Sequence, residues 1–230
     1  MSTRHGGVSP DPLGMNLSFR VKDDPVNVAE NRRRLFTALG MGLTSAAIPV
    51  QCHSDHIEVV SEPGDYESSD ALLTNTVNLS LVVTVADCMA VVLFDPVRKV
   101  LATVHAGWRG TAAAIVRKSL VCMGERFGVS PDDVVAYLSP SAGPCCYEIG
   151  AEVAEVFGSS YVENRDERLY LDLRKANADQ LRAGGLAESN IEISSRCTIC
   201  NPDLFHSFRR DGDRSGRMMA VAWLTDRRRS

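Results

Sequence analysis

Three segments of the sequence place a metal-ligating or nucleophilic side chain just after an apolar, β-type run. They carry His53, Cys88 and His105. Imidazole and thiolate groups bind zinc, and three protein ligands with an open fourth position are typical of a catalytic zinc site. The wide separations match no short chelating motif, so spacing alone equally allows a buried cysteine and two histidines in ordinary hydrogen bonds.

Charged and aromatic residues lie next to these positions. Asp87 directly precedes Cys88 and could orient a ligand or carry a proton, although a carboxylate in a strand-end turn is the plainer interpretation. Arg109 falls near the start of a predicted helix, where a guanidinium can bind phosphate or a nucleoside hydroxyl or simply pair with a carboxylate. Trp108 could stack on a purine or act as a packing residue.

Two further groups are candidates for substrate binding. Arg209 and Arg210 form a second candidate anion clamp, with a solvated loop as the alternative. Arg4 and His5 precede two glycines and could fold over the site or belong to a mobile N-terminus.

The seven cysteines indicate a reduced protein. An odd number that includes the adjacent pair Cys145 and Cys146 is not a disulfide framework, so we expect a cytoplasmic chain in which a functional cysteine is a ligand or a nucleophile. Cys197-x-x-Cys200 is the only pair with that spacing. Because adjacent cysteines form a poor chelate, we interpret these four as structural thiols.

Composition narrows the class of protein. The chain has 230 residues, 44% hydrophobic and 23% charged, with a net charge of -4, which gives no basic field for nucleic acid. It has no apolar run long enough for a membrane helix and no apolar leader at its start. The five histidines are too few for the imidazole ligands of a four-copper oxidase.

The elements that must position these residues form an α+β pattern. We predict helices near 25–39, 111–127, 151–157 and 173–182, and strands at 48–52, 57–60, 71–74, 79–85, 90–94, 100–105, 134–138, 191–193 and 218–224. Strands cluster in the middle and alternate only partly with helices, which favours α+β over a doubly wound parallel sheet. We predict a single domain over residues 1–230 with mixed sheets packed against helices.

Several motifs together resemble the YfiH-type family, first described as polyphenol oxidase or laccase-domain proteins and later as purine nucleoside phosphorylases. The most specific is His-Ala-Gly-Trp-Arg-Gly-Thr at 105–111, preceded by Ala-Asp-Cys at 86–88. The others follow in order over nearly the whole chain, at 4–9, 30–32, 69–74, 144–150, 197–200, 205–211 and 216–217. Ser139, Ala142 and His206 depart from the family pattern, and the first two bear on the shape of a loop and on substrate choice.

The resemblance implies a layered α/β/β/α fold and a zinc ion held by His53, Cys88 and His105, so that it selects His53 over His56. It further implies phosphorolysis of adenosine, inosine, guanosine or methylthioadenosine and deamination of adenosine. Asp87 and Arg109 are then candidate catalytic residues, and Arg4, Trp108, Arg209 and Arg210 candidate substrate-binding residues. We expect purine nucleoside and phosphate as partners, with no nucleic acid or membrane, in a monomer or homodimer.

Three other functions remain open. A cysteine hydrolase or deamidase would use Cys88 as nucleophile and His105 as base. A copper oxidase acting on phenols is disfavoured, because one copper in a site of two histidines and one cysteine cannot deliver the four electrons that reduce O₂ to water. A metal-binding interaction protein would show a closed fourth ligand or no substrate cavity.

Overall fold

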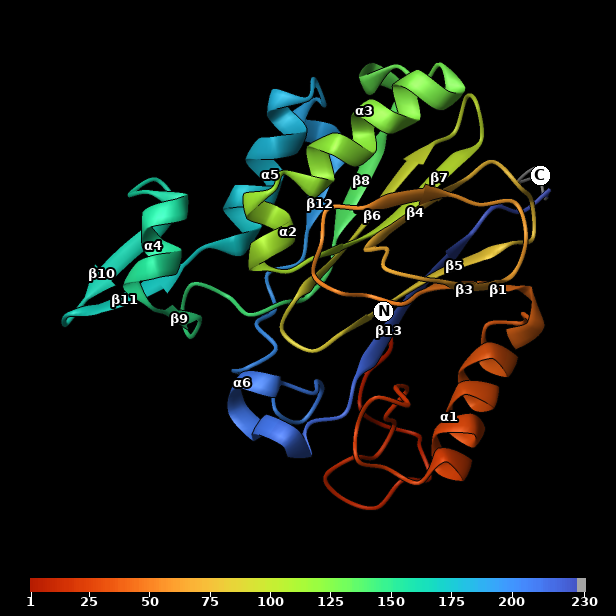
Figure 1. The fold of residues 1–230 in the computed structure, drawn as a ribbon, viewed down its shortest axis with the longest axis horizontal. Helices are drawn as coiled ribbons and strands as arrows, with labels where there is room; N and C mark the ends of the chain where they lie inside the picture. Colours follow the sequence, from red (N-terminus) through yellow and green to blue (C-terminus); the bar gives the residue numbers. More distant parts are fainter. Residues whose placement is uncertain (227–230) are drawn as a thin grey trace.

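Two mixed β-sheets lie face to face between layers of helices in this computed structural model, which describes residues 1–226 (Figure 1). The helices α3 (Ile115–Phe127) and α5 (Leu173–Ala183) cover the outer face of one sheet, and α1 (Pro25–Ala38) covers the outer face of the other. The chain therefore has the α+β architecture that the sequence predicts, with the α/β/β/α layers that the resemblance implies.

The larger sheet has six strands in mixed orientation. In spatial order they are β12 (Ile191–Ile193), β8 (Val135–Leu138), β6 (Met89–Asp95), β7 (Val100–Ala106), β4 (Ala71–Thr74) and β2 (Ile57–Val59). The outermost pairs, β12 with β8 and β2 with β4, are parallel, and the inner pairs are antiparallel. Every residue of β7 is buried, because this strand has helices on one face and the second sheet on the other.

The smaller sheet has four strands, β13 (Met218–Trp223), β5 (Ser80–Val85), β1 (Ala46–Pro49) and β3 (Gly64–Tyr66). Its inner face packs on the larger sheet through residues such as Leu81, against Leu72 and Leu101. Its outer face packs on α1 through Phe36 against Val82. The start of α1 follows its sequence signals, with Asp24 accepting a hydrogen bond from the Val26 backbone N–H and Pro25 in the first turn.

The remaining elements lie at the periphery of the two sheets. A three-stranded sheet of β10 (Val162–Arg165), β11 (Arg168–Leu171) and β9 (Glu148–Ile149) projects beside α4 (Ala151–Phe157) at the left of Figure 1. The short helices are α2 (Trp108–Ala112), α6 (Phe208–Asp211), η1 (Leu43–Ser45), η2 (Pro131–Asp133), η3 (Glu188–Asn190) and η4 (Gly212–Arg214). Within residues 1–226, each helix is too short or too polar to cross a bilayer.

Two predicted elements differ from the structure in ways that matter for the site. The predicted helix at 111–127 begins earlier and is broken into α2 and α3, because Ala114 adopts the left-handed conformation with φ 59°. The predicted strand at 48–52 ends at Pro49. Beyond it the Gln51 side chain bonds the Thr84 backbone N–H and C=O at 2.8 and 2.9 Å, so that a side-chain amide replaces the backbone ladder.

Candidate functional site

His53, Cys88 and His105 converge at one end of the two sheets. One ligating atom from each, an imidazole nitrogen or the thiol sulfur, lies within 4.8 Å of the others. His53 is in the loop after β1, Cys88 in the turn between β5 and β6, and His105 near the end of β7. His56 belongs elsewhere, since its Nε2 pairs with Glu58 at 2.8 Å on the surface. The structure therefore gathers the three residues that the sequence singles out.

Asp70 organises this group and was not predicted from the sequence. Its fully buried carboxylate lies 2.7 Å from His105 Nδ1 and accepts hydrogen bonds from the His53 and Ser54 backbone N–H groups at 3.1 and 2.7 Å. The bond to Nδ1 leaves His105 Nε2 free for the centre of the group, as in carboxylate–histidine–metal arrangements. Local spacing carries no signal for this role, because Asp70 lies far from all three residues in the chain.

Two backbone positions allow the three metal-type side chains to lie close together. His53 adopts the left-handed conformation with φ 63°, held by the N–H bond to Asp70. At Gly107 a Cβ atom would lie 2.8 Å from Cys88 Sγ and 3.4 Å from His53 Cδ2. The glycine after His105 and Ala106 is thus required by packing against the ligands.

The electrostatics favour charged forms of the cysteine and of its histidine neighbour. Burial by itself would raise the pKa of the Cys88 thiol, but the His105 and His53 rings outweigh it and lower that pKa to about 6. Burial likewise opposes a charge on His105, yet Cys88 and Asp70 raise its pKa to about 9. The nearby imidazoles stabilise the thiolate, which is the form that binds a metal or attacks a carbon.

The donor set fits a single metal ion. Two imidazoles and one thiolate suit zinc, and they also suit copper in a different geometry. The group opens on a cavity of about 430 Å³ that is lined by all three residues. This volume is within the range of about 300 to 1,000 Å³ that is typical of small-molecule sites.

Arginines line the same cavity as the metal-binding residues. Arg109 and Arg209 were predicted, whereas Arg20 and Arg217 were not. The Arg109 guanidinium stacks on the Trp108 ring at 4.4 Å, and both side chains belong to the lining, at the start of α2. Arg209 lies 5.1 Å from the Tyr147 ring and donates to the Glu148 backbone C=O at 2.9 Å. Four guanidinium groups beside a metal-type cluster make the cavity suited to an anionic ligand.

Asp87 also borders the cavity, but its carboxylate already accepts three hydrogen bonds. The donors are the hydroxyls of Thr198 and Ser207, at 2.6 and 3.0 Å, and the Arg209 backbone N–H at 2.7 Å. Asp87 has φ 80°, another left-handed residue next to a ligand. These contacts fasten the 198–209 segment to the turn that carries Cys88.

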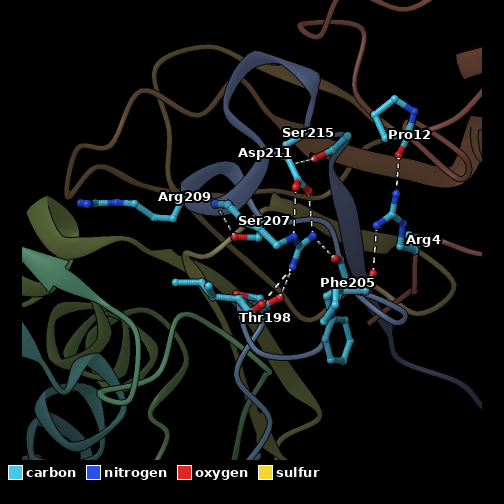
Figure 2. Close-up of polar contacts among 12 residues, drawn as sticks. Arg4, Pro12, Thr198, Phe205, Ser207, Arg209, Asp211 and Ser215 are labelled. Carbon is cyan, nitrogen blue, oxygen red and sulfur yellow. Dashed lines mark hydrogen bonds and ion pairs between the residues drawn. The ribbon is translucent and has the colours of Figure 1, made fainter.

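Arg4 and Arg210 are placed elsewhere. Arg4 donates to the carbonyls of Pro12 and Pro202, at 2.7 and 2.9 Å, and ties the N-terminal segment to the 202–204 loop (Figure 2). The Arg210 guanidinium forms a two-bond pair with Asp211 and donates to three backbone carbonyls. Neither is among the residues that line the cavity, and both side chains hold loops together instead.

Four other cysteines lie closer together than their spacing in the sequence indicates. The sequence analysis interpreted them as structural thiols, because an adjacent pair is a poor chelate. In the structure one Sγ atom from each of Cys145, Cys146, Cys197 and Cys200 lies within 4.8 Å of the others. The fold brings the loop before β9 against the loop after β12, which local spacing could not reveal.

Comparison with known proteins matches residues 1–225 to the family described as multi-copper polyphenol oxidoreductase laccase. The chain belongs to this family. A purine nucleoside phosphorylase of Deinococcus radiodurans is 38% identical, with 98% of this chain and 88% of that protein aligned. The purine nucleoside phosphorylase YlmD of Geobacillus stearothermophilus is 32% identical, with 96% of this chain and 87% of that protein aligned.

Solved structures of this family have the same fold. The crystal structure of the hypothetical protein YfiH from Bacillus licheniformis matches with a TM-score of 0.93 at 30% identity, covering 97% of this chain and 91% of that one. The crystal structure of YlmD from Geobacillus stearothermophilus also gives 0.93, at 32% identity, with 97% and 90% covered. The architecture described above is therefore that of the YfiH and YlmD proteins.

Proposed function

We propose that the chain is a zinc-dependent purine nucleoside phosphorylase that acts on adenosine, inosine, guanosine or methylthioadenosine. We propose deamination of adenosine as a second reaction of the same site. The observation that carries the proposal is one cavity lined by His53, Cys88 and His105 and also by four arginines. The relatives named purine nucleoside phosphorylase support the same reaction class.

Zinc suits the donor set better than a multi-copper centre. Within residues 1–226, two groups of side chains could hold a metal, and only one of them contains histidines. An oxidase that reduces O₂ to water needs several coppers with mostly imidazole ligands, which these side chains cannot supply. Bound at the three donors, zinc would supply Lewis-acid chemistry to an oxygen of the substrate, of phosphate or of water.

In phosphorolysis a phosphate oxygen forms a bond to the ribose C1′ while the bond from C1′ to the purine nitrogen breaks. The products are ribose 1-phosphate and the free base, which takes up a proton. Positive charge builds on the sugar, so the chain must hold the phosphate against C1′. We propose that Arg109 and Arg209 bind the phosphate and that Trp108 stacks on the purine.

Asp87 is proposed to serve this site in two ways. Its carboxylate borders the cavity, where it can accept or donate the proton that the purine exchanges. Its bond to the Arg209 backbone also positions that guanidinium. In deamination, water adds to the purine C6, the C–N bond breaks and the amino group leaves as ammonia, and the same carboxylate is the candidate proton carrier.

The proposed partners, location and oligomeric state are based on the sequence. Purine nucleoside and phosphate are the proposed partners, and a net charge of -4 argues against a nucleic-acid partner. A cytoplasmic location and a monomeric or homodimeric state remain proposals that follow from cysteine usage and the resemblance.

A specific contact also favours a second function. Cys88, His105 and Asp70 are arranged as a nucleophile, a base and a carboxylate that orients the base, since Asp70 lies 2.7 Å from His105 Nδ1. This is the arrangement of a cysteine hydrolase. His53 distinguishes the two functions, because a second imidazole at the sulfur is expected for metal binding and serves no role in such a triad.

One preparation assayed in two ways tests the proposal. Protein purified without added metal is analysed for zinc and copper, and the same sample receives adenosine or inosine with and without phosphate. We expect free base and ribose 1-phosphate only with phosphate, and inosine from adenosine in its absence. Cys88→Ala is expected to lose both the metal of this site and the turnover while it stays folded, because a core of this size does not depend on a metal.

Two other results would contradict this proposal. Phenol oxidation that tracks the copper content, without nucleoside turnover under any condition, would overturn the proposal. A zinc-free protein whose Cys88 is rapidly alkylated and which hydrolyses amides would favour the cysteine hydrolase.

A further inference from the structure

Four cysteine sulfurs gather away from the proposed active site. Cys145 and Cys146 lie in the turn before β9, and Cys197 and Cys200 follow β12. The Sγ atom of Cys200 lies 3.0 Å from that of Cys146 and 3.4 Å from that of Cys145, and all four lie within 4.8 Å. Sulfurs around a tetrahedral zinc, at about 2.3 Å from the ion, are about 3.8 Å apart. The observed distances between the sulfurs therefore lie on both sides of the distance that zinc requires.

The backbone around Cys197 is arranged to stabilise a thiolate. Its buried sulfur accepts a hydrogen bond from the Gly143 N–H at 3.3 Å. Bonds from N–H groups favour the charged form of a sulfur. The two-residue spacing between Cys197 and Cys200 is also the usual one for a pair of zinc ligands in structural sites.

The two loops are fixed against each other independently of the sulfurs. Ser141 and Cys197 form a β-bridge, and the Thr198 N–H donates to the Ser141 C=O at 3.0 Å. A Cβ at Gly143 would lie 3.2 Å from Cys197 Cβ, so the glycine permits this approach. The four sulfurs are therefore held together by a preformed backbone frame.

Three arginines hold the backbone of the loops that carry the cluster. Arg165 donates to the Pro144 C=O, Arg174 to the Ser195 C=O at 3.0 Å, and Arg210 to the carbonyls of Thr198 and Ile199 at 3.0 and 3.2 Å. The Nε atoms of Arg165 and Arg174 are buried without a hydrogen-bond acceptor on the protein. Four thiolates around a divalent ion carry two negative charges, and Arg174 is the nearby guanidinium that would offset part of them, since Arg210 is already paired with Asp211 and Arg165 lies 3.5 Å from Glu163.

We propose that Cys145, Cys146, Cys197 and Cys200 form a second metal site that binds zinc through four thiolates. Thiolate ligands select zinc over harder cations, and four protein ligands leave no open position. The site is therefore structural, and it is independent of the reaction proposed above. It would fasten the loop that leads to Tyr147 against the loop that carries Thr198, the residue bonded to Asp87.

Metal counting on matched variants tests this site. The chain is prepared under reducing conditions, saturated with zinc, freed of excess metal, and analysed by elemental analysis and native mass spectrometry. We expect two zinc ions per chain in the wild type, and one in Cys145→Ser/Cys200→Ser, which retains only two of the four thiols. Cys88→Ala is also expected to hold one, and the combined variant none. Cys122→Ser, a half-buried thiol on α3, is the control that should keep two.

Three results would overturn the proposal. The first is an unchanged zinc count in Cys145→Ser/Cys200→Ser. The second is a wild-type chain that binds one zinc only, lost with Cys88→Ala. The third is a wild-type chain that loses two mass units per bond as disulfides form among these four cysteines instead of binding zinc.

A second measurement needs no variant of the cluster. Cobalt in place of zinc gives a sulfur-to-metal charge-transfer absorption that grows with the number of thiolate ligands. In the Cys88→Ala background we expect the strong absorption and tetrahedral visible bands of a four-thiolate site. Their absence in that folded variant would contradict the proposal, whatever the activity of the enzyme.

Discussion

At the scale of single residues, the site depends on side chains and glycines that hold the ligands rather than on the ligands alone. Asp70 bonds both His105 and the backbone of His53, so one buried carboxylate orients two of the three donors. Hydrogen bonds to ligands normally matter almost as much as the ligands themselves.

We expect Asp70→Asn to weaken zinc binding at the histidine site by about 10- to 100-fold, because the amide no longer accepts from His105 Nδ1 as a charged group. Competition with a chelator of known affinity measures the change. Asp55→Asn is the control, since Asp55 forms an exposed ion pair with Lys118. Equal zinc affinity in Asp70→Asn and wild type would show that the carboxylate has no role in metal binding.

Gly107→Ala is expected to disrupt the same site for a steric reason. The new methyl would lie 2.8 Å from Cys88 Sγ, so that the sulfur or the backbone must move. The zinc count should fall toward that of Cys88→Ala. Gly42→Ala is a suitable control, because its methyl would meet no atom closer than 3.4 Å. Full zinc occupancy in Gly107→Ala would contradict the packing argument.

At the scale of elements, a short helix, α2, separates the end of β7 from the long helix α3. Ala114 in the left-handed conformation ends the first short helix, and α3 then packs on the six-stranded sheet as a separate element. Trp108 and Arg109, at the start of α2, both line the cavity.

The proposed phosphate contact predicts the effect of Arg109→Lys. Lysine keeps the charge but loses the planar fork and its stacking on Trp108. We expect kcat/KM for phosphorolysis to fall about ten- to a hundred-fold, which corresponds to about 1 to 3 kcal/mol. Arg117→Lys, on α3 away from the cavity lining, should leave the rate unchanged. A wild-type rate in Arg109→Lys would remove Arg109 from the proposed phosphate site.

At the scale of the whole molecule, the N-terminal segment packs against the segment that leads into β13. The Leu17 N–H donates to the Arg217 C=O at 3.0 Å, and His206 is packed nearby, against Gly216 and Asn16. The His206 ring is fully buried, and neither of its nitrogens has a hydrogen-bond partner on the protein. Burial lowers the pKa of His206 to about 4, so the folded protein keeps this ring neutral.

Because of the buried His206, we predict that the free energy of unfolding depends on pH. The unfolded chain binds a proton at His206 below its ordinary pKa of 6.5, whereas the folded chain does so only near 4. The free energy of unfolding should therefore fall as the pH drops from 6.5 to 4, by up to about 3 kcal/mol from this group. Urea unfolding of wild type and His206→Phe at several pH values measures the contribution of His206, because the variant lacks this titrating group. Parallel curves for the two proteins would show that His206 does not contribute.

The sequence by itself determined the residues whose chemistry is local and the elements whose periodicity is strong. His53, Cys88 and His105 each follow or end an apolar run, and the resemblance selected His53. The α+β class follows the same way, since buried strands and amphipathic helices are encoded in short stretches of chain, whereas the layered arrangement came from the resemblance.

The tertiary structure alone decided which distant side chains meet. It added Asp70, Arg20 and Arg217 to the site, and it directed Arg4 and Arg210 to loop carbonyls instead. It also joined an adjacent pair of cysteines to a second pair from another loop. These outcomes depend on how loops cross and where side chains point after the sheets have packed, and no local pattern in the sequence records either.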